Sequence, residues 1–161
     1  MLYKNTQIGY VLIVANMIVI SLLGYVFTSV ETDAIGKWGL AIFLLLFLFL
    51  LFLFFSLTVK VTDTEVTWYF GPGLWKYHIQ LDQIKDVEVV KTNPLEGIGI
   101  RFTPSKGLLY NVSGLSAVKI IKKDGDTIRI GSNEPIILAE VISKNTDISD
   151  NIFKKDIAKG T

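Results

Sequence analysis

The sequence predicts an α+β membrane protein in which a two-helix transmembrane hairpin precedes a small antiparallel β barrel or sandwich that ends in a C-terminal helix. Three observations predict this class: two long uncharged apolar runs, a change to period-two alternation from Leu57 onward, and a helix-like segment near the C-terminus. We expect a hairpin at 1–57, a β domain with its terminal helix at 58–145, and a polar tail at 146–161.

The strongest membrane signal is the run at 38–57, which contains no charged residue and six phenylalanines. At a rise of ~1.5 Å per residue, a helix of this length spans the ~30 Å hydrocarbon core of a bilayer. A second uncharged run, 8–30, is too long for the core of an ordinary signal peptide, and it ends without a small-x-small cleavage site. We therefore interpret it as a second transmembrane helix. Asn16 lies in its middle, and we expect this amide to pack against the neighbouring helix or another copy.

The connection between the two runs, 31–37, is so short that they must form a tight antiparallel hairpin with both chain ends on one side. Lys4, Lys60 and Lys76 would lie near the membrane on that side, whereas the connection contains only Lys37. Because positive charge is enriched on the cytoplasmic side of membranes, both termini are predicted to be cytoplasmic.

The soluble half is predicted to consist of short strands. The first two, 57–61 and 66–70, are separated by an acidic turn, and the glycines and proline at 71–73 end the second. Further strands are expected at 75–81, 84–91, 97–102, 107–112, 117–123 and 127–132, giving seven or eight in all. Trp68 and Ile100 each belong to a period-two apolar face, so we expect both in the core.

A helix is predicted at 132–145. Ser132 or Asn133 can cap its first turn, which also contains Glu134 and Pro135. Its apolar face is formed by Leu138, Val141 and Ile142. The tail that follows mixes three lysines with isolated apolar residues, and we expect a loosely ordered or membrane-surface segment.

The stretch 97–138 carries a resemblance to known proteins. The residues concerned are Gly99, Ile100, Arg101, Leu109, Tyr110, Asn111, Val112, Ser113, Gly114, Ala117, Val118, Arg129, Ile130, Gly131, Glu134 and Pro135. With them the soluble half resembles small bacterial membrane proteins to which no activity is assigned. More broadly, the chain looks like the bacterial pleckstrin-homology-like (PH-like) domain families that are anchored by transmembrane helices. The resemblance implies a PH-like fold at the inner (plasma) membrane, and it implies no activity.

Catalytic and metal-binding patterns are not found in the sequence. Cysteine is absent, which excludes disulfides and thiolate ligands. The single histidine, His78, has no partner at ligand spacing, and we expect it to face solvent from a strand. No serine lies in a GxSxG or SxxK pattern, and the glycine-rich segments lack the lysine of a phosphate loop. We predict a protein that is not an enzyme and needs no cofactor or metal.

Two groups of residues are candidates for binding. The first is a basic set in strands that we expect to be neighbours, and it comprises Arg101, Lys119, Lys122, Lys123 and Arg129. These residues could contact anionic headgroups or a partner, although lysines at a solvated sheet edge give the same pattern, and we favour that simpler interpretation. The second is the polar turn at 110–114, whose Asn and Ser side chains we expect to bond local backbone.

The preferred function is a multi-pass membrane protein that presents its β domain at the cytoplasmic surface to a protein partner or to its own copies. Two alternatives remain open: a sensor of anionic lipid headgroups that uses the basic set, and an accessory subunit of a membrane enzyme or transporter. With 16 basic and 15 acidic residues the chain lacks the concentrated positive charge of a nucleic-acid-binding protein. We therefore expect the lipid bilayer as a partner and no nucleic acid.

Overall fold

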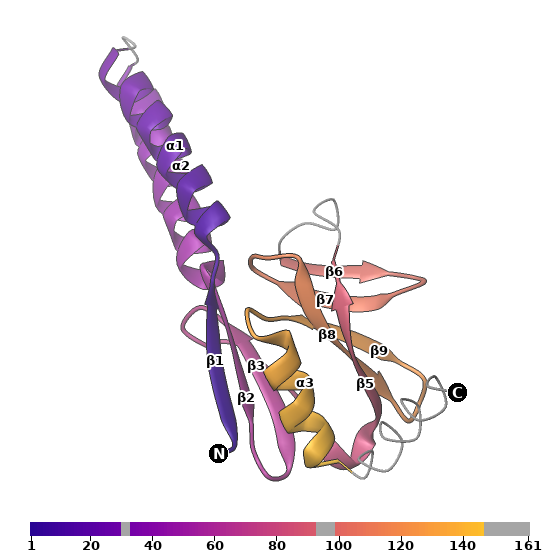
Figure 1. Cartoon of the computed structure of the whole chain (residues 1–161). Coiled ribbons are helices and arrows are strands. Elements are labelled where there is room, and N and C mark those ends of the chain that lie inside the picture. Colours follow the sequence, from indigo (N-terminus) through magenta and orange to yellow (C-terminus); the bar gives the residue numbers. More distant parts are fainter. Residues whose placement is uncertain (30–32, 93–98, 147–161) are drawn as a thin grey trace.

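The computed structural model describes residues 1–29, 33–92 and 99–146. Two long helices, α1 (Tyr10–Ser29) and α2 (Ala34–Phe54), run side by side and project from one end of a β domain (Figure 1). The Asp33 side chain accepts a hydrogen bond from the Gly36 backbone N–H at 3.0 Å and caps the start of α2. The expected tail lies outside the described residues except for Thr146.

The first sheet contains four antiparallel strands in the order β1-β2-β3-β4. Their bounds are Tyr3–Ile8 for β1, Ser56–Val61 for β2, Glu65–Phe70 for β3 and Lys76–Gln80 for β4. Strand β1 precedes α1 in the chain, yet it pairs with β2, which follows α2. The helical hairpin is therefore an insertion between two neighbouring strands of one sheet.

The second sheet contains five strands in the order β5-β8-β9-β7-β6, and a single 3₁₀ turn, η1 (Leu81–Gln83), leads into it. The strands are β5 (Ile84–Lys91), β6 (Gly99–Thr103), β7 (Gly107–Asn111), β8 (Ser116–Lys122) and β9 (Thr127–Gly131). All neighbours are antiparallel except β7 and β9, which are parallel.

Helix α3 (Pro135–Lys144) packs against β5 and β8. Leu138 and Ile142 are completely buried on its inner face, and Val141 packs beside them, which confirms the predicted apolar face. The Ser132 hydroxyl accepts a hydrogen bond from the Glu134 backbone N–H at 3.0 Å just before the helix begins. Glu134 in turn accepts a bond from the Asn5 side chain at 3.0 Å, which connects the start of α3 to β1.

The core lies between the two sheets and α3. Its buried apolar residues include Leu57, Val59, Val61, Val66, Trp68, Phe70, Ile79, Tyr110, Val112, Val118, Ile120, Ile130, Leu138 and Ile142. Trp68 is 1% exposed, as the sequence predicted. The structure confirms the α+β class, with two long apolar helices followed by two largely antiparallel sheets and a terminal helix.

The hairpin was expected to occupy residues 1–57, and the structure shortens it at both ends. Residues 3–8, assigned to the hairpin segment 1–57, form β1 of the first sheet, and α1 begins only at Tyr10. The second helix was expected at 38–57. It begins earlier because Asp33 caps it, and it ends earlier because Leu57 is wholly buried in β2.

The predicted burial of Ile100 is wrong, because its side chain is 41% exposed. Ile100 belongs to β6, which is an edge strand, and its outward side borders the base of the helical hairpin. Trp75 was expected inside a strand at 75–81, but β4 begins only at Lys76 and Trp75 is 61% exposed. In both cases the apolar side chain lies outside the core, and Ile100 shares a groove with residues of the two long helices.

Candidate functional site: the junction of the helical hairpin and the β domain

Both helices continue into the β domain without a linker. One residue, Gly9, separates β1 from α1, and one residue, Phe55, separates α2 from β2. The Gly9 backbone N–H donates to the Phe55 carbonyl at 2.8 Å, so the strand pairing extends to the first turn of the helices. Consequently the direction of the hairpin is fixed relative to the first sheet.

The turn between β3 and β4 presses against the last turn of α2. Gly71 has φ +47°, and a methyl group on its Cα would lie 2.5 Å from the Leu53 carbonyl oxygen. Only glycine combines this backbone conformation with such a close approach. The Gly71 N–H also donates to the Ser56 carbonyl at 2.9 Å, which holds the turn at the base of the helix.

A polar contact joins the second sheet to the start of α1. The Ser113 hydroxyl donates to the Ile8 carbonyl at 2.9 Å, and the Gln7 side-chain amide donates to the Ser113 carbonyl. Gln7 is 1% exposed. The sequence predicted local bonds for the turn at 110–114; Asn111 makes one, to the Gly114 carbonyl at 3.4 Å, whereas Ser113 bonds across to β1.

An aromatic cluster lies beneath the end of α2. The Phe54 and Phe70 ring centroids are 5.6 Å apart, and Tyr110 lies 5.3 Å from Trp68 and 4.8 Å from Tyr77. Burial, with a smaller contribution from the neighbouring Tyr77, raises the pKa of Tyr110 to about 12. The cluster thus joins the helix to both sheets through packing.

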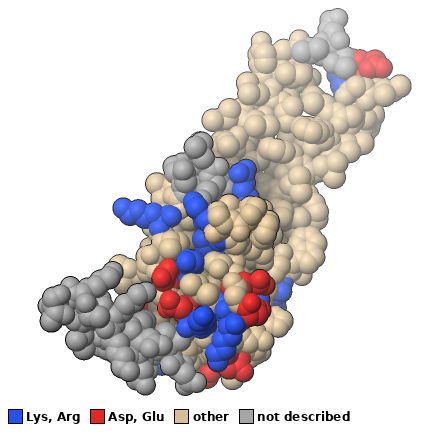
Figure 2. Space-filling model, turned by 90° about the vertical axis from the view of Figure 1, so that its right-hand side faces the viewer, with Lys and Arg blue, Asp and Glu red and all other residues tan. Residues whose placement is uncertain are grey.

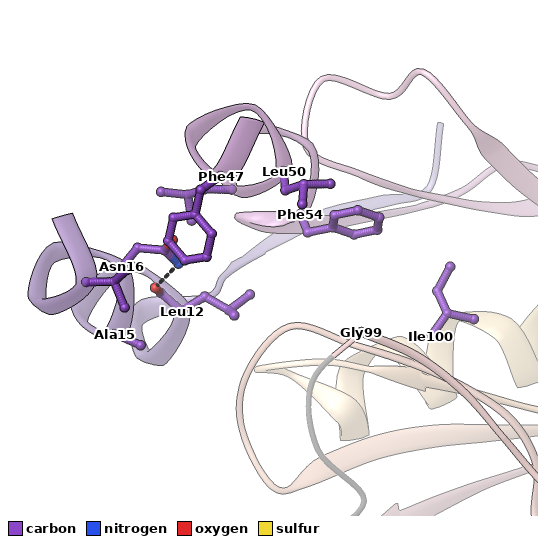
Figure 3. Close-up of a pocket in the computed structure, with 10 residues that line it drawn as sticks. Leu12, Ala15, Asn16, Phe47, Leu50, Phe54, Gly99 and Ile100 are labelled. Atoms are coloured by element: carbon purple, nitrogen blue, oxygen red, sulfur yellow. Dashed lines mark hydrogen bonds between the residues drawn. The ribbon is translucent and has the colours of Figure 1, made fainter. Parts of the chain in front are cut away.

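An open groove of about 580 Å³ lies between the two long helices and the start of β6 (Figure 3). Its walls are Leu12, Ala15, Asn16, Val19, Phe47, Leu50, Leu51, Phe54, Gly99 and Ile100. Asn16 was expected to pack against the neighbouring helix or another copy. It is buried, and its amide donates to the Leu12 carbonyl of its own helix at 2.6 Å. The groove therefore presents an almost wholly apolar surface.

The basic set predicted from the sequence does not form one patch. Cross-strand register aligns Arg101, Arg129 and Lys119 in one row of the second sheet. Arg129 is 3% exposed, and Lys119 forms an ion pair with Glu88 at 3.2 Å. Lys122 and Lys123 lie apart from this row, around the β8–β9 turn.

At that turn Lys122 is paired with Asp124 at 2.9 Å and with Asp126 at 3.2 Å. The hydrogen bond from Lys122 is the main reason that the pKa of the Asp124 carboxyl is lowered. Ser116, at the start of β8, lies next to the turn that contains Ser113. Both lysines are at the other end of β8, away from that turn. The arrangement places acidic charge among the lysines and weakens their attraction for an anionic surface.

His78 is exposed on β4, as expected. Within residues 1–29, 33–92 and 99–146, no three potential metal ligands of the His, Asp or Glu type come together. The residues that define the junction, Gln7, Gly71 and Ser113, were not singled out for it from the sequence. The sequence contains one feature that could have indicated the junction. Leu74 and Trp75 follow a Gly-Pro-Gly turn, where exposed polar residues are usual.

No protein-family model matches the chain, and no curated protein or solved structure matches it. Function must therefore be inferred from the junction and from the surfaces around it.

Proposed function

We propose that the chain is a non-enzymatic integral membrane protein, whose two helices cross the inner membrane as a hairpin and hold the β domain at the cytoplasmic surface. There the domain would act as an interaction module for a protein partner or a second copy. One observation carries the proposal: α1 and α2 are inserted between β1 and β2, which pair along six residues from Tyr3 opposite Val61 to Ile8 opposite Ser56. Because β1 and β2 pair with each other, the start of α1 and the end of α2 must lie on the same side of a membrane that the two helices cross.

The surface of the helices supports a lipid environment. Each is long and apolar enough to cross a membrane, and only 6% of each candidate span is buried within the protein. The core helix of a soluble domain would instead be mostly buried. Figure 2 shows the hairpin almost bare of charged side chains except at its far end, whereas basic and acidic side chains are crowded on the β domain.

The distribution of charge supports the cytoplasmic side for the β domain. Among the described residues on the face seen in Figure 2, the basic side chains nearest the hairpin are drawn without acidic ones between them, and the acidic ones lie farther from it. Positive charge beside a span favours the cytoplasmic side, where anionic lipids also attract it.

A PH-like fold remains part of the proposal. Two facing sheets and a helix at the C-terminal end of the described chain support the resemblance. The first strand of this domain, however, precedes the hairpin, and β7 and β9 are parallel. We therefore place the interaction role on the exposed domain as a whole, and we assign no ligand from the resemblance.

Reporter fusions test the proposal. Green fluorescent protein at either terminus should fluoresce, and alkaline phosphatase at either terminus should be inactive, because both ends are expected in the cytoplasm. Termini on opposite sides would refute the hairpin, and active phosphatase at both ends would reverse the orientation. Release of the chain from membranes by alkaline carbonate would refute membrane integration itself.

Two differently tagged copies, expressed together and purified in mild detergent, test the interaction role. Co-purification of the second tag supports self-association, and recovery of a stoichiometric membrane enzyme or transporter would favour the accessory-subunit alternative. Retention of anionic lipid that is lost in Lys122→Glu with Lys123→Glu would favour the lipid sensor.

A further inference from the structure

Four large apolar side chains outside the helices are exposed at the junction. Leu74 is 63% exposed, Trp75 61%, Leu115 53% and Ile100 41%. They come from three segments: the β3–β4 turn, the turn that precedes β8, and the edge strand β6. We call these four residues the junction ring.

Each member of the ring belongs to a segment that lies at the base of the hairpin. Leu74 and Trp75 follow Gly71 in the β3–β4 turn, and Gly71 lies against the last turn of α2. Leu115 follows the turn that bonds to Gln7 and Ile8 at the end of β1, next to α1. Ile100 shares the groove with residues of both helices, and Figure 3 shows it across from Phe54.

The length of the helices fixes the depth of the ring. Helix α1 has 20 residues and α2 has 21. At ~1.5 Å per residue these lengths match the ~30 Å hydrocarbon core, so neither helix has a spare turn that could lift the β domain away from the membrane. The headgroup layer extends about 5–8 Å beyond the core on each side. The β3–β4 turn, the turn that precedes β8 and the start of β6, which lie at the base of the helices, are therefore expected in that layer.

We infer that the junction ring is a lipid-contacting surface, seated in the headgroup layer of the same bilayer that the hairpin crosses. The inference rests on the proposed membrane insertion. The bilayer is the occupant because Ile100 shares the apolar groove with residues of both helices, and the turns that carry the other three residues are held at the base of the same hairpin. The indole of Trp75 suits this layer, where an aromatic ring meets apolar chains and its N–H meets polar groups.

Tryptophan fluorescence gives a direct test with the full chain. The protein contains three tryptophans, of which Trp68 is buried in the core and Trp38 lies near the far end of the hairpin. Three variants keep Trp68 and hence the core: Trp38→Phe, Trp75→Phe and the double variant. Each is reconstituted into phosphatidylcholine and phosphatidylglycerol vesicles, with or without bromine on the upper part of the acyl chains.

The double variant sets the baseline, because buried Trp68 should lose little emission to bromine. We expect Trp38→Phe, which retains Trp75, and Trp75→Phe, which retains Trp38, both to lose emission beyond that baseline. Quenching in Trp75→Phe alone would overturn the ring while leaving the hairpin inserted. Baseline emission in both variants would overturn the insertion and the ring together.

Because the chain contains no cysteine, a second test can use single labels at other positions. Leu115→Cys places a polarity-sensitive fluorophore in the ring. Asp63→Cys is the control, because Asp63 is exposed in the β2–β3 turn, at the end of β2 opposite to Ser56 and the hairpin. A bromine-dependent loss at position 115 that is absent at position 63 supports the inference. Equal loss at the two positions, or none at position 115, would refute it.

Discussion

Replacing Trp68 by alanine should remove the centre of the aromatic cluster. The side chain is 1% exposed and contacts Tyr77 and Tyr110, so truncation creates a cavity that its neighbours cannot fill. Such a change costs about 3–5 kcal/mol. Trp68→Phe should cost far less, about 1 kcal/mol, because the indole Nε1 finds no hydrogen-bond partner in the described part of the chain and its removal offsets the lost packing.

Pulse proteolysis of the detergent-solubilised chain in increasing urea measures both variants, because it reports the folded fraction without depending on tryptophan emission. With a urea slope of about 2 kcal/mol per molar, alanine should lower the unfolding midpoint by about 2 M. His78→Ala, on the neighbouring strand and exposed, is the matched control and should stay within about 0.5 kcal/mol of the parent. An alanine variant as stable as the parent would refute the packing argument, and a phenylalanine variant as unstable as alanine would refute the role assigned to Nε1.

Three further predictions use the same chain. Gly71→Ala should lower the free energy of unfolding by about 1–3 kcal/mol more than Gly125→Ala, because both glycines have positive φ but only Gly71 faces a backbone oxygen; equal urea midpoints would disprove the close contact. Folding holds the proton on Tyr110, so the stability that this group contributes should be constant below about pH 10 and be lost as pH rises from the ordinary pKa of 10.0 toward about 12. Thermal melts across this range should fall less steeply for Tyr110→Phe, and parallel curves would contradict the assignment. Asn16→Leu should leave membrane integration and the melting temperature in detergent unchanged or slightly raised, because the amide bonds only its own helix in the described chain; loss of either property would show a role between helices or subunits.

The period-two pattern located most strands of the β domain correctly. Buried and partly buried residues alternate strictly in β3, and the alternation is weaker in β7 and β8. Strand β1 was missed because its inward positions are Tyr3, Asn5 and Gln7, so the face that packs is polar. Its side chains donate hydrogen bonds to Glu134, just before α3, and to the Ser113 carbonyl. Such partners lie more than 100 residues away and leave no local pattern.

The same pattern misled at Ile100 for a different reason. An alternating apolar face predicts only that its side chains are removed from water. A protein core and a lipid layer meet that requirement equally. The edge position of β6 leaves Ile100 outside the core, and this position depends on sheet order. The basic set shows a similar limit, since the register that separates Lys122 from the Arg129 row follows from tertiary pairing.

The placement of β1 imposes an order on biosynthesis. Residues 3–8 leave the ribosome before both long helices, and their pairing partners at 56–61 follow only after the helices have been made. Until then β1 presents an unpaired strand whose amides have no sheet to join. Strand β1 can pair only after α2 and then β2 have been synthesised. The β domain can therefore be completed only after both helices of the hairpin have been made. A chain stalled or misinserted between α1 and α2 would keep an open strand edge, the kind of surface that chaperones and proteases act on.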